Sequence, residues 1–274
     1  MATVAGAYTK VEPRPDVLSG TPRAHAVDRW IFVFMAAWFI AITLAGFIPD
    51  SIMKVGMVRA GARPPFPLVL HMHAVLMGSF LLLLLAQTSL MATGRRELHM
   101  RLGILGMALA GALVAVGFVL APTMYHETWN ALQSAPPNAR AKLQELLSIK
   151  ENILLLQIRI GILFPLFLAI GLRARKGNAG LHKRMIILAT VMALPAGIDR
   201  IPWLPTALPA SPVSVDLYTI LAVSPMLVWD VIRNHSLHRA YWIWFAVTLP
   251  CAVIVNLLWN TPAWHALARQ IMAV

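Results

Sequence analysis

Long runs of apolar residues alternate with short polar and basic segments along most of the chain. The run from Leu68 to Thr93 has no charged residue apart from its histidines, and a helix of 26 residues is long enough for a ~30 Å hydrocarbon layer. Six other runs share this composition. We predict seven membrane-spanning helices at Trp30–Ile48, Leu68–Thr93, Leu102–Pro122, Ile153–Leu172, Met185–Leu204, Val213–Ile232 and Tyr241–Trp259.

The spans define the domain organisation. Residues 1–26 form a polar cytoplasmic tail, residues 27–265 the transmembrane bundle, and residues 266–274 a C-terminal end. The outer segment 123–152 is expected to contain a short interfacial helix, because leucines recur at helical spacing within residues 139–149. The other outer connection, from Pro49 to Pro67, is rich in proline and glycine and predicts an irregular loop.

Composition and charge agree with an integral membrane protein. Of 274 residues, 59% are hydrophobic and only 12% are charged, which is too apolar for a soluble domain of this size. The net charge is +12, and the basic residues lie in short clusters between the apolar runs. This placement is typical of residues that set the orientation of a membrane protein, and it argues against a nucleic-acid partner. A single cysteine, Cys251, excludes an intrachain disulfide and a cysteine-based metal cluster.

The distribution of basic residues predicts the orientation. With the N-terminus inside, fourteen lysines and arginines lie on the cytoplasmic side and eight on the other, and Arg159 lies within a span. Cytoplasmic segments carry the excess of basic residues, so we expect the C-terminus outside. The partner is then the lipid bilayer of a bacterial inner membrane.

A short motif is repeated at the predicted inner ends of three spans. Leu-His-x-Arg occurs at 98–101 and 181–184, and Leu-His-Arg occurs at 237–239. The repeat predicts three helical hairpins, spans two and three, four and five, and six and seven, with the first span added in front. The expected fold is an all-α membrane protein, a seven-helix bundle built of hairpins.

Two interpretations of the motif remain open. Its histidines can cap helix N-termini while the following basic residue meets lipid phosphates. Alternatively, His99 and His182 lie at matching depths and face each other as ligands of a haem or a metal ion. Gln87, near the same level of the second span, would then support the ligands.

A second group of polar residues lies toward the outer end. His71 and His73 are two residues apart on a helix and so point to different sides, which leaves at most one of them, His73, facing the bundle. The remaining candidates for an outer ligand pocket are His126, Glu127, Arg159, Asp199 and Arg200. Within this group, His73 and His126 are the candidate metal ligands.

Arg159 is the most unusual of these residues. An arginine at the centre of a span costs at least ~2.5 kcal/mol to insert unless it is paired, hydrated or reaches the interface. The candidate partners are Asp199, Glu127 and Glu151. Three explanations of this arginine remain open. It could form a structural ion pair, it could bind an anion, a haem propionate or a quinone carbonyl, or the predicted span boundary could be incorrect.

The motifs permit two comparisons with known proteins. The block from His73 through Gln87 to Gly103, followed by the motif at 181–184, resembles a widespread group of uncharacterised bacterial multi-spanning inner-membrane proteins. More loosely, histidines at the starts of the third and fifth spans look like those of di-haem transmembrane cytochromes b. That likeness implies haem ligation by His99 and His182, but the fourth span has no histidine to complete a second, outer haem with His73.

Two functions are therefore expected. One is a membrane protein that binds a redox cofactor, haem or metal, or a quinone-like ligand. The alternative is a cofactor-free transporter or a proton-coupled small-molecule binding protein that uses the outer pocket. Histidine suits either function because its charge changes near neutral pH.

Overall fold

The computed structural model describes residues 16, 18 and 25–274, so the predicted N-terminal tail 1–26 lies almost entirely outside the described residues. The described chain is helical and contains no strand. Its helices are α1 (Ala26–Arg59), α2 (Leu68–Ala92), α3 (Arg96–Gln133), α4 (Pro137–Ala174), α5 (Ala179–Val191), α6 (Pro195–Ile198), α7 (Val213–Asn234), α8 (Arg239–Leu258) and α9 (Pro262–Ile271).

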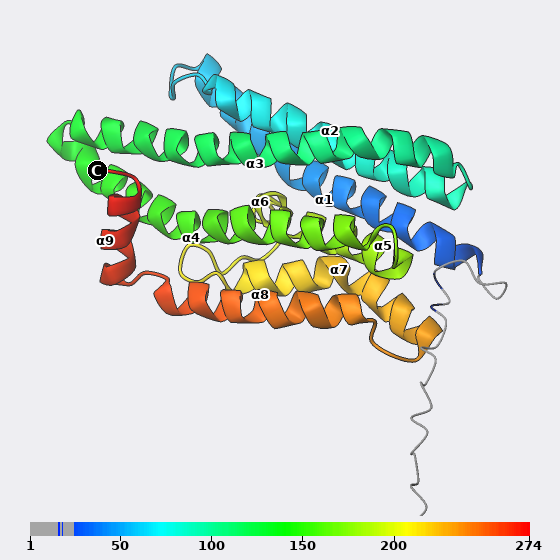
Figure 1. Cartoon of the computed structure of the whole chain (residues 1–274). Coiled ribbons are helices and arrows are strands. Elements are labelled where there is room, and N and C mark those ends of the chain that lie inside the picture. Colours follow the sequence, from blue (N-terminus) through cyan, green and yellow to red (C-terminus); the bar gives the residue numbers. More distant parts are fainter. Residues whose placement is uncertain (1–15, 17, 19–24) are drawn as a thin grey trace, which may run out of the picture.

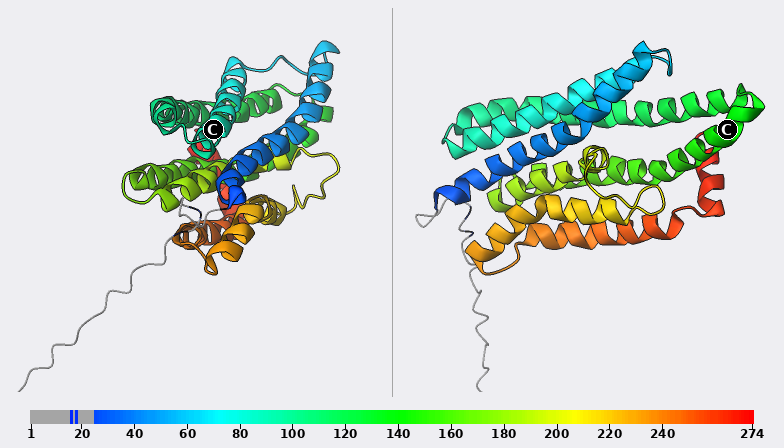
Figure 2. Two further views of the ribbon diagram at one scale, coloured as in Figure 1. Left: turned by 90° about the vertical axis from the view of Figure 1, so that its right-hand side faces the viewer. Right: turned by 180° about the vertical axis from the view of Figure 1, so that it is seen from behind.

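Seven segments are long and apolar enough to cross a membrane, which confirms the predicted bundle. They are α1, α2, α3, α4, α5 together with α6, α7 and α8. Helices α2 and α3 lie along one side of the bundle, α7 and α8 lie along the opposite side, and α4 and α5 lie between them (Figures 1 and 2). We call the end where α1, α3, α5 and α8 begin the inner end, following the predicted orientation, which stays a prediction.

Helix α5 forms the centre of the packed core. In its membrane-spanning window 67% of the residues are buried, against 11% in α3. Helices α1, α7 and α8 supply the large side chains around it, among them Phe39, Met226 and Trp244, each fully buried. Protein interiors are close-packed, and any shift of α5 would open voids against these side chains. Packing on several sides therefore helps to set the position of α5.

Two predicted outer loops are helical instead. Helix α1 continues through Pro49 to Arg59, and its extension carries an ion pair between Lys54 and Asp50 at 2.7 Å. The prediction of an irregular loop from Pro49 was wrong because membrane helices tolerate an internal proline when neighbouring groups satisfy the freed carbonyl. The connection to α2 is therefore confined to residues 60–67.

The predicted outer loop at 123–152 is also largely helical. Helix α3 continues to Gln133 and α4 begins at Pro137, so each contains 38 residues, about 57 Å at 1.5 Å per residue. The leucine spacing within 139–149 was read correctly as helical, but this segment belongs to α4 and is no separate interfacial helix. Both helices extend well beyond a ~30 Å hydrocarbon layer.

The fifth span is broken. Helix α5 ends at Val191, and the single turn α6 begins at Pro195, because proline lacks the N–H that would continue the hydrogen-bond ladder. Helical structure ends at Ile198, so the predicted single span Met185–Leu204 was too long at its outer end. At the C-terminus, α9 crosses position 265, the expected end of the bundle, and stands across the outer ends of α4 and α8 (Figure 1).

Helices α1 and α6 touch through two glycines. A Cβ atom added to Gly46 would lie 1.9 Å from the backbone carbonyl oxygen of Gly197, which is far inside van der Waals contact. The two backbones can approach this closely only because neither residue has a side chain. This contact holds the broken end of the fifth span against α1.

We predict that Gly46→Ala destabilises the protein by about 1–3 kcal/mol, the usual cost of overpacking. Gly56→Ala is the matched control in the same helix, because a Cβ at Gly56 meets no atom within 4 Å. Unfolding in a denaturing detergent, followed by circular dichroism, measures both variants. Equal stability of the two variants would contradict the close approach of α1 and α6.

Candidate functional site

His99 and His182 face each other near the inner end of the bundle. His99 lies in the first turn of α3 and His182 in the first turn of α5. Their ring centroids are 6.5 Å apart and their planes are inclined by 80°. The helix starts that carry the repeated motif therefore bring two imidazoles together across the bundle.

Each ring is held by a backbone carbonyl of the preceding helix. His99 Nδ1 lies 3.3 Å from the carbonyl oxygen of Gln87 on α2, and His182 Nδ1 lies 2.8 Å from that of Gly171 on α4. A carbonyl oxygen can only accept a hydrogen bond, so Nδ1 must be the protonated nitrogen in both rings. In the neutral imidazole this leaves Nε2 with a free lone pair, the state that a metal ion requires.

In the described chain, few other side chains that could bind a metal ion lie near this pair of histidines. Among the described residues, no group of three or more histidine, cysteine, aspartate or glutamate side chains is placed to hold a metal ion. Gln87, predicted as a supporting residue, contributes its backbone carbonyl, while its side-chain Oε1 is buried and has no hydrogen-bond partner. Arg175, at the inner end of α4, lies close enough for its charge to act on His182.

Arg159 is buried on α4 and pairs with a residue that was not among its three predicted partners. Its Nη1 donates to Asp216 Oδ1 on α7 at 2.6 Å, and Asp216 also accepts from Asn256 on α8 at 3.2 Å. The three candidate partners Asp199, Glu127 and Glu151 were wrong. The residue was missed because Asp216 is 57 positions away and the pairing depends on how the hairpins pack.

The other residues of the predicted outer pocket lie on α2, on α3 and at the end of α6. No hydrogen bond or ion pair of the described residues joins any two of them. Arg200 pairs with Asp50 of α1 at 3.3 Å, and Asp199 Oδ1 is buried without a partner at the end of α6. Their side chains thus do not form an ion pair with each other.

His73 and His126, the two histidines of the predicted outer metal site, have different surroundings. His73 of α2 has a buried Nδ1 with no partner, and the ring of His126 packs edge-on against Tyr125 within α3. Glu127 lies near Lys150 of α4. A metal site formed by His73 and His126 stays a prediction.

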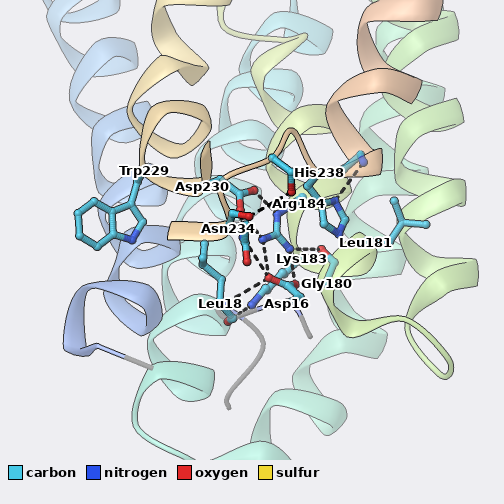
Figure 3. A network of polar contacts seen from close by, with 12 residues as sticks. Asp16, Leu18, Gly180, Leu181, Lys183, Arg184, Trp229, Asp230, Asn234 and His238 are labelled. Carbon is cyan, nitrogen blue, oxygen red and sulfur yellow. Dashed lines mark hydrogen bonds and ion pairs between the residues drawn. The ribbon is translucent and has the colours of Figure 1, made fainter. Parts of the chain in front are cut away.

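A buried ion-pair network joins α5, α7 and the N-terminal segment (Figure 3). Arg184 of α5 is fully buried and binds Asp230 of α7 through two hydrogen bonds of 2.5 and 2.8 Å. It also binds Asp16 of the N-terminal segment at 2.7 and 2.9 Å. Sequence analysis missed this network, although an aspartate within an apolar span, Asp230, was a signal for it.

The three copies of the repeated motif have different roles. The arginine of the first copy, Arg101, is exposed and pairs with Glu97, whereas that of the second copy is buried in the network. A lipid-facing role was therefore wrong for Arg184. The histidine of the third copy, His238, accepts a hydrogen bond from the backbone N–H of Ala240 and caps α8, as the first interpretation expected.

A second ion cluster holds the outer end together. Glu151 of α4 is fully buried and lies 2.6 Å from His265 Nδ1 and 2.8 Å from Arg269 Nε, both on α9. Tyr125 of α3 donates to the same carboxylate, and the indole of Trp264 donates to the Glu151 carbonyl at 2.8 Å. The polar face of α9 is thereby fixed to the extended ends of α3 and α4.

Comparisons with protein-family models, with curated proteins and with solved structures found no match. The chemistry of the site must therefore be argued from its own residues.

We predict that Arg184→Met destabilises the protein by about 3–5 kcal/mol, because it removes the arginine that pairs with the fully buried carboxylate of Asp230. Arg101→Met, at the matching position of the first motif copy, should change stability by no more than about 0.5 kcal/mol, since that pair is exposed. Detergent unfolding measures both variants. Similar losses in both would contradict the different roles of the two arginines.

We also predict a pH effect at His238. Burial, followed by the nearby positive charge of Arg184, lowers the pKa of His238 from its usual 6.5 to about 4. The folded state then favours the neutral ring, so its contribution to stability is present above pH 6.5 and is lost as the pH falls toward 4.

His238→Asn keeps a side chain that can accept from the N–H of Ala240 and cannot titrate. The thermal stability of this variant should fall less than that of the wild type between pH 6.5 and 4. His71→Asn, at an exposed position, is the control and should follow the wild type. Parallel pH profiles for all three proteins would refute the role of His238.

Proposed function

We propose that this integral membrane protein is a haem-binding redox protein in which His99 and His182 would hold the haem. The observation that carries the proposal is the pair of facing imidazoles, 6.5 Å apart between ring centroids. This separation would leave room for a metal ion bonded to both imidazoles over about 2 Å. The spacing of the pair thus fits one ion between the rings.

The hydrogen bonds support the same arrangement. Metal-bound histidines usually donate their other ring N–H to a carbonyl or carboxylate, which fixes the tautomer and the ring orientation. The carbonyls of Gln87 and Gly171 have this role for His99 and His182. Both imidazoles are therefore oriented by main-chain atoms of rigid helices before any ligand binds.

The number of ligands favours haem over a bare metal ion. A protein-bound zinc ion takes three or four protein ligands, and the described residues offer no third histidine, cysteine, aspartate or glutamate beside the two histidines. A porphyrin supplies the remaining nitrogens itself, so two histidines are sufficient. When bound, haem would supply one-electron chemistry close to one membrane surface.

Charges near the pair are also compatible with this ligand. Arg101 is bonded to Glu97, and Arg184 is bonded to Asp230, so neither cation is directed at the imidazoles. Arg175 is exposed at the inner end of α4, donates to the sulfur of Met107 at 3.6 Å and lies near His182. We propose that Arg175 would bind a haem propionate.

The test is an absorption spectrum of protein expressed with a haem precursor and purified in mild detergent. We expect a Soret band and a reduced-minus-oxidised difference spectrum typical of two histidine ligands. His99→Ala and His182→Ala should each abolish the low-spin spectrum, while His73→Ala and His238→Ala should retain it. Circular dichroism checks that each variant is folded.

A wild-type protein that is folded but binds no haem under these conditions would overturn the proposal. Haem that survives unchanged in both His99→Ala and His182→Ala would overturn the assignment of the ligands.

The cofactor-free transporter stays the alternative function. It would use the outer residues His73, Glu127, Arg159, Asp199 and Arg200, of which Arg159 and Arg200 are each already paired with another residue. No further observation favours it.

A further inference from the structure

A small cavity lies between α4, α5, α7 and α8, away from the histidine pair. Its volume is about 20 Å³, enough for one water molecule. Arg159, Met192, Asp216, Trp244, Thr248 and Leu249 contribute to its wall. The cavity therefore adjoins the buried ion pair of Arg159 and Asp216.

Three polar atoms of the residues that line this cavity are buried without a hydrogen-bond partner among the described residues. They are Nε of Arg159, Nε1 of Trp244 and Oγ1 of Thr248. The exposed fractions of these residues are only 4%, 0% and 7%. Buried polar atoms nearly always have a partner in the protein or an ordered water, so three on one cavity point to an occupant.

The chemistry of the wall selects the occupant. The N–H groups of Arg159 and Trp244 can only donate, a hydroxyl can do either, and the Asp216 carboxylate can only accept. An anion would satisfy the donors but would lie against the carboxylate, and an apolar group would leave the donors unpaired. Water fits because it can accept two hydrogen bonds and donate two.

We propose that this cavity is an internal hydration site in which one water accepts from Arg159 and Trp244 and donates to Asp216 and Thr248. The water extends the ion pair between α4 and α7 into a hydrogen-bonded connection to α8. The inference does not depend on haem binding.

Radical footprinting tests the site directly. Short X-ray pulses produce hydroxyl radicals from water that is bound inside a protein, and side chains beside that water become oxidised even when they are shielded from bulk solvent. Met192 and Trp244 line the cavity and are 1% and 0% exposed. Met185 and Met226 are both 0% exposed and do not line it, so they are matched controls.

We expect the full-length protein in lipid nanodiscs to show several-fold faster oxidation of Met192 and Trp244 than of Met185 and Met226. Mass spectrometry of proteolytic fragments measures the rates. Protection of all four residues would show that the cavity is dry and would overturn the proposal. Equal oxidation of all four would also overturn it, because it would indicate general opening of the bundle.

A pair of variants isolates the hydrogen bonds. Thr248→Val removes the cavity hydroxyl with little change of shape and should reduce oxidation of Met192. Thr190→Val is the control, because Thr190 is buried on α5 and its hydroxyl is bonded to the Ile186 carbonyl at 2.9 Å. An unchanged Met192 rate in folded Thr248→Val would count against the proposed water.

Discussion

The position of α5 depends on the buried ion pair between Arg184 and Asp230. Taking two charges out of water costs several kcal/mol per ion, which is recovered only when geometry and hydrogen bonding are nearly ideal. The pair has two short hydrogen bonds, and Asp16 occupies the remaining side of the guanidinium. Because His182 precedes Arg184 by two residues on the same helix, the network also fixes where that imidazole lies.

A second ion pair acts with the first to join the same elements. Helix α7 carries Asp216 near its start and Asp230 near its end, 14 residues or about 21 Å apart. Both bind arginines of the α4–α5 hairpin, Arg159 and Arg184. Apolar packing in a membrane is weakly directional, since lipid tails are as apolar as leucine. Two charge pairs at this separation define which face of α7 meets the hairpin.

The spans and the hairpins could be predicted from the sequence, whereas the helix ends and the ion-pair partners could not. Apolar runs identified all seven spans, and the repeated motif identified the hairpins and the His99–His182 pair. Helix ends were less accurate, because α3 and α4 continue beyond the predicted spans as a more polar helical hairpin that hydropathy does not detect. The partners of Arg159 and Arg184 were not predictable, since they depend on the rotation of α7.

Differences among the three motif copies explain why only two histidines form a pair. His99 and His182 each reach a carbonyl of the preceding helix, 12 and 11 residues back, within a tight hairpin. His238 follows a turn in which His235 adopts a left-handed conformation, and its ring caps its own helix through Ala240. A ring that accepts a backbone N–H through Nδ1 has no proton there to donate to a carbonyl. The third copy therefore lacks the carbonyl contact that orients the other two imidazoles, and it stabilises α8 instead.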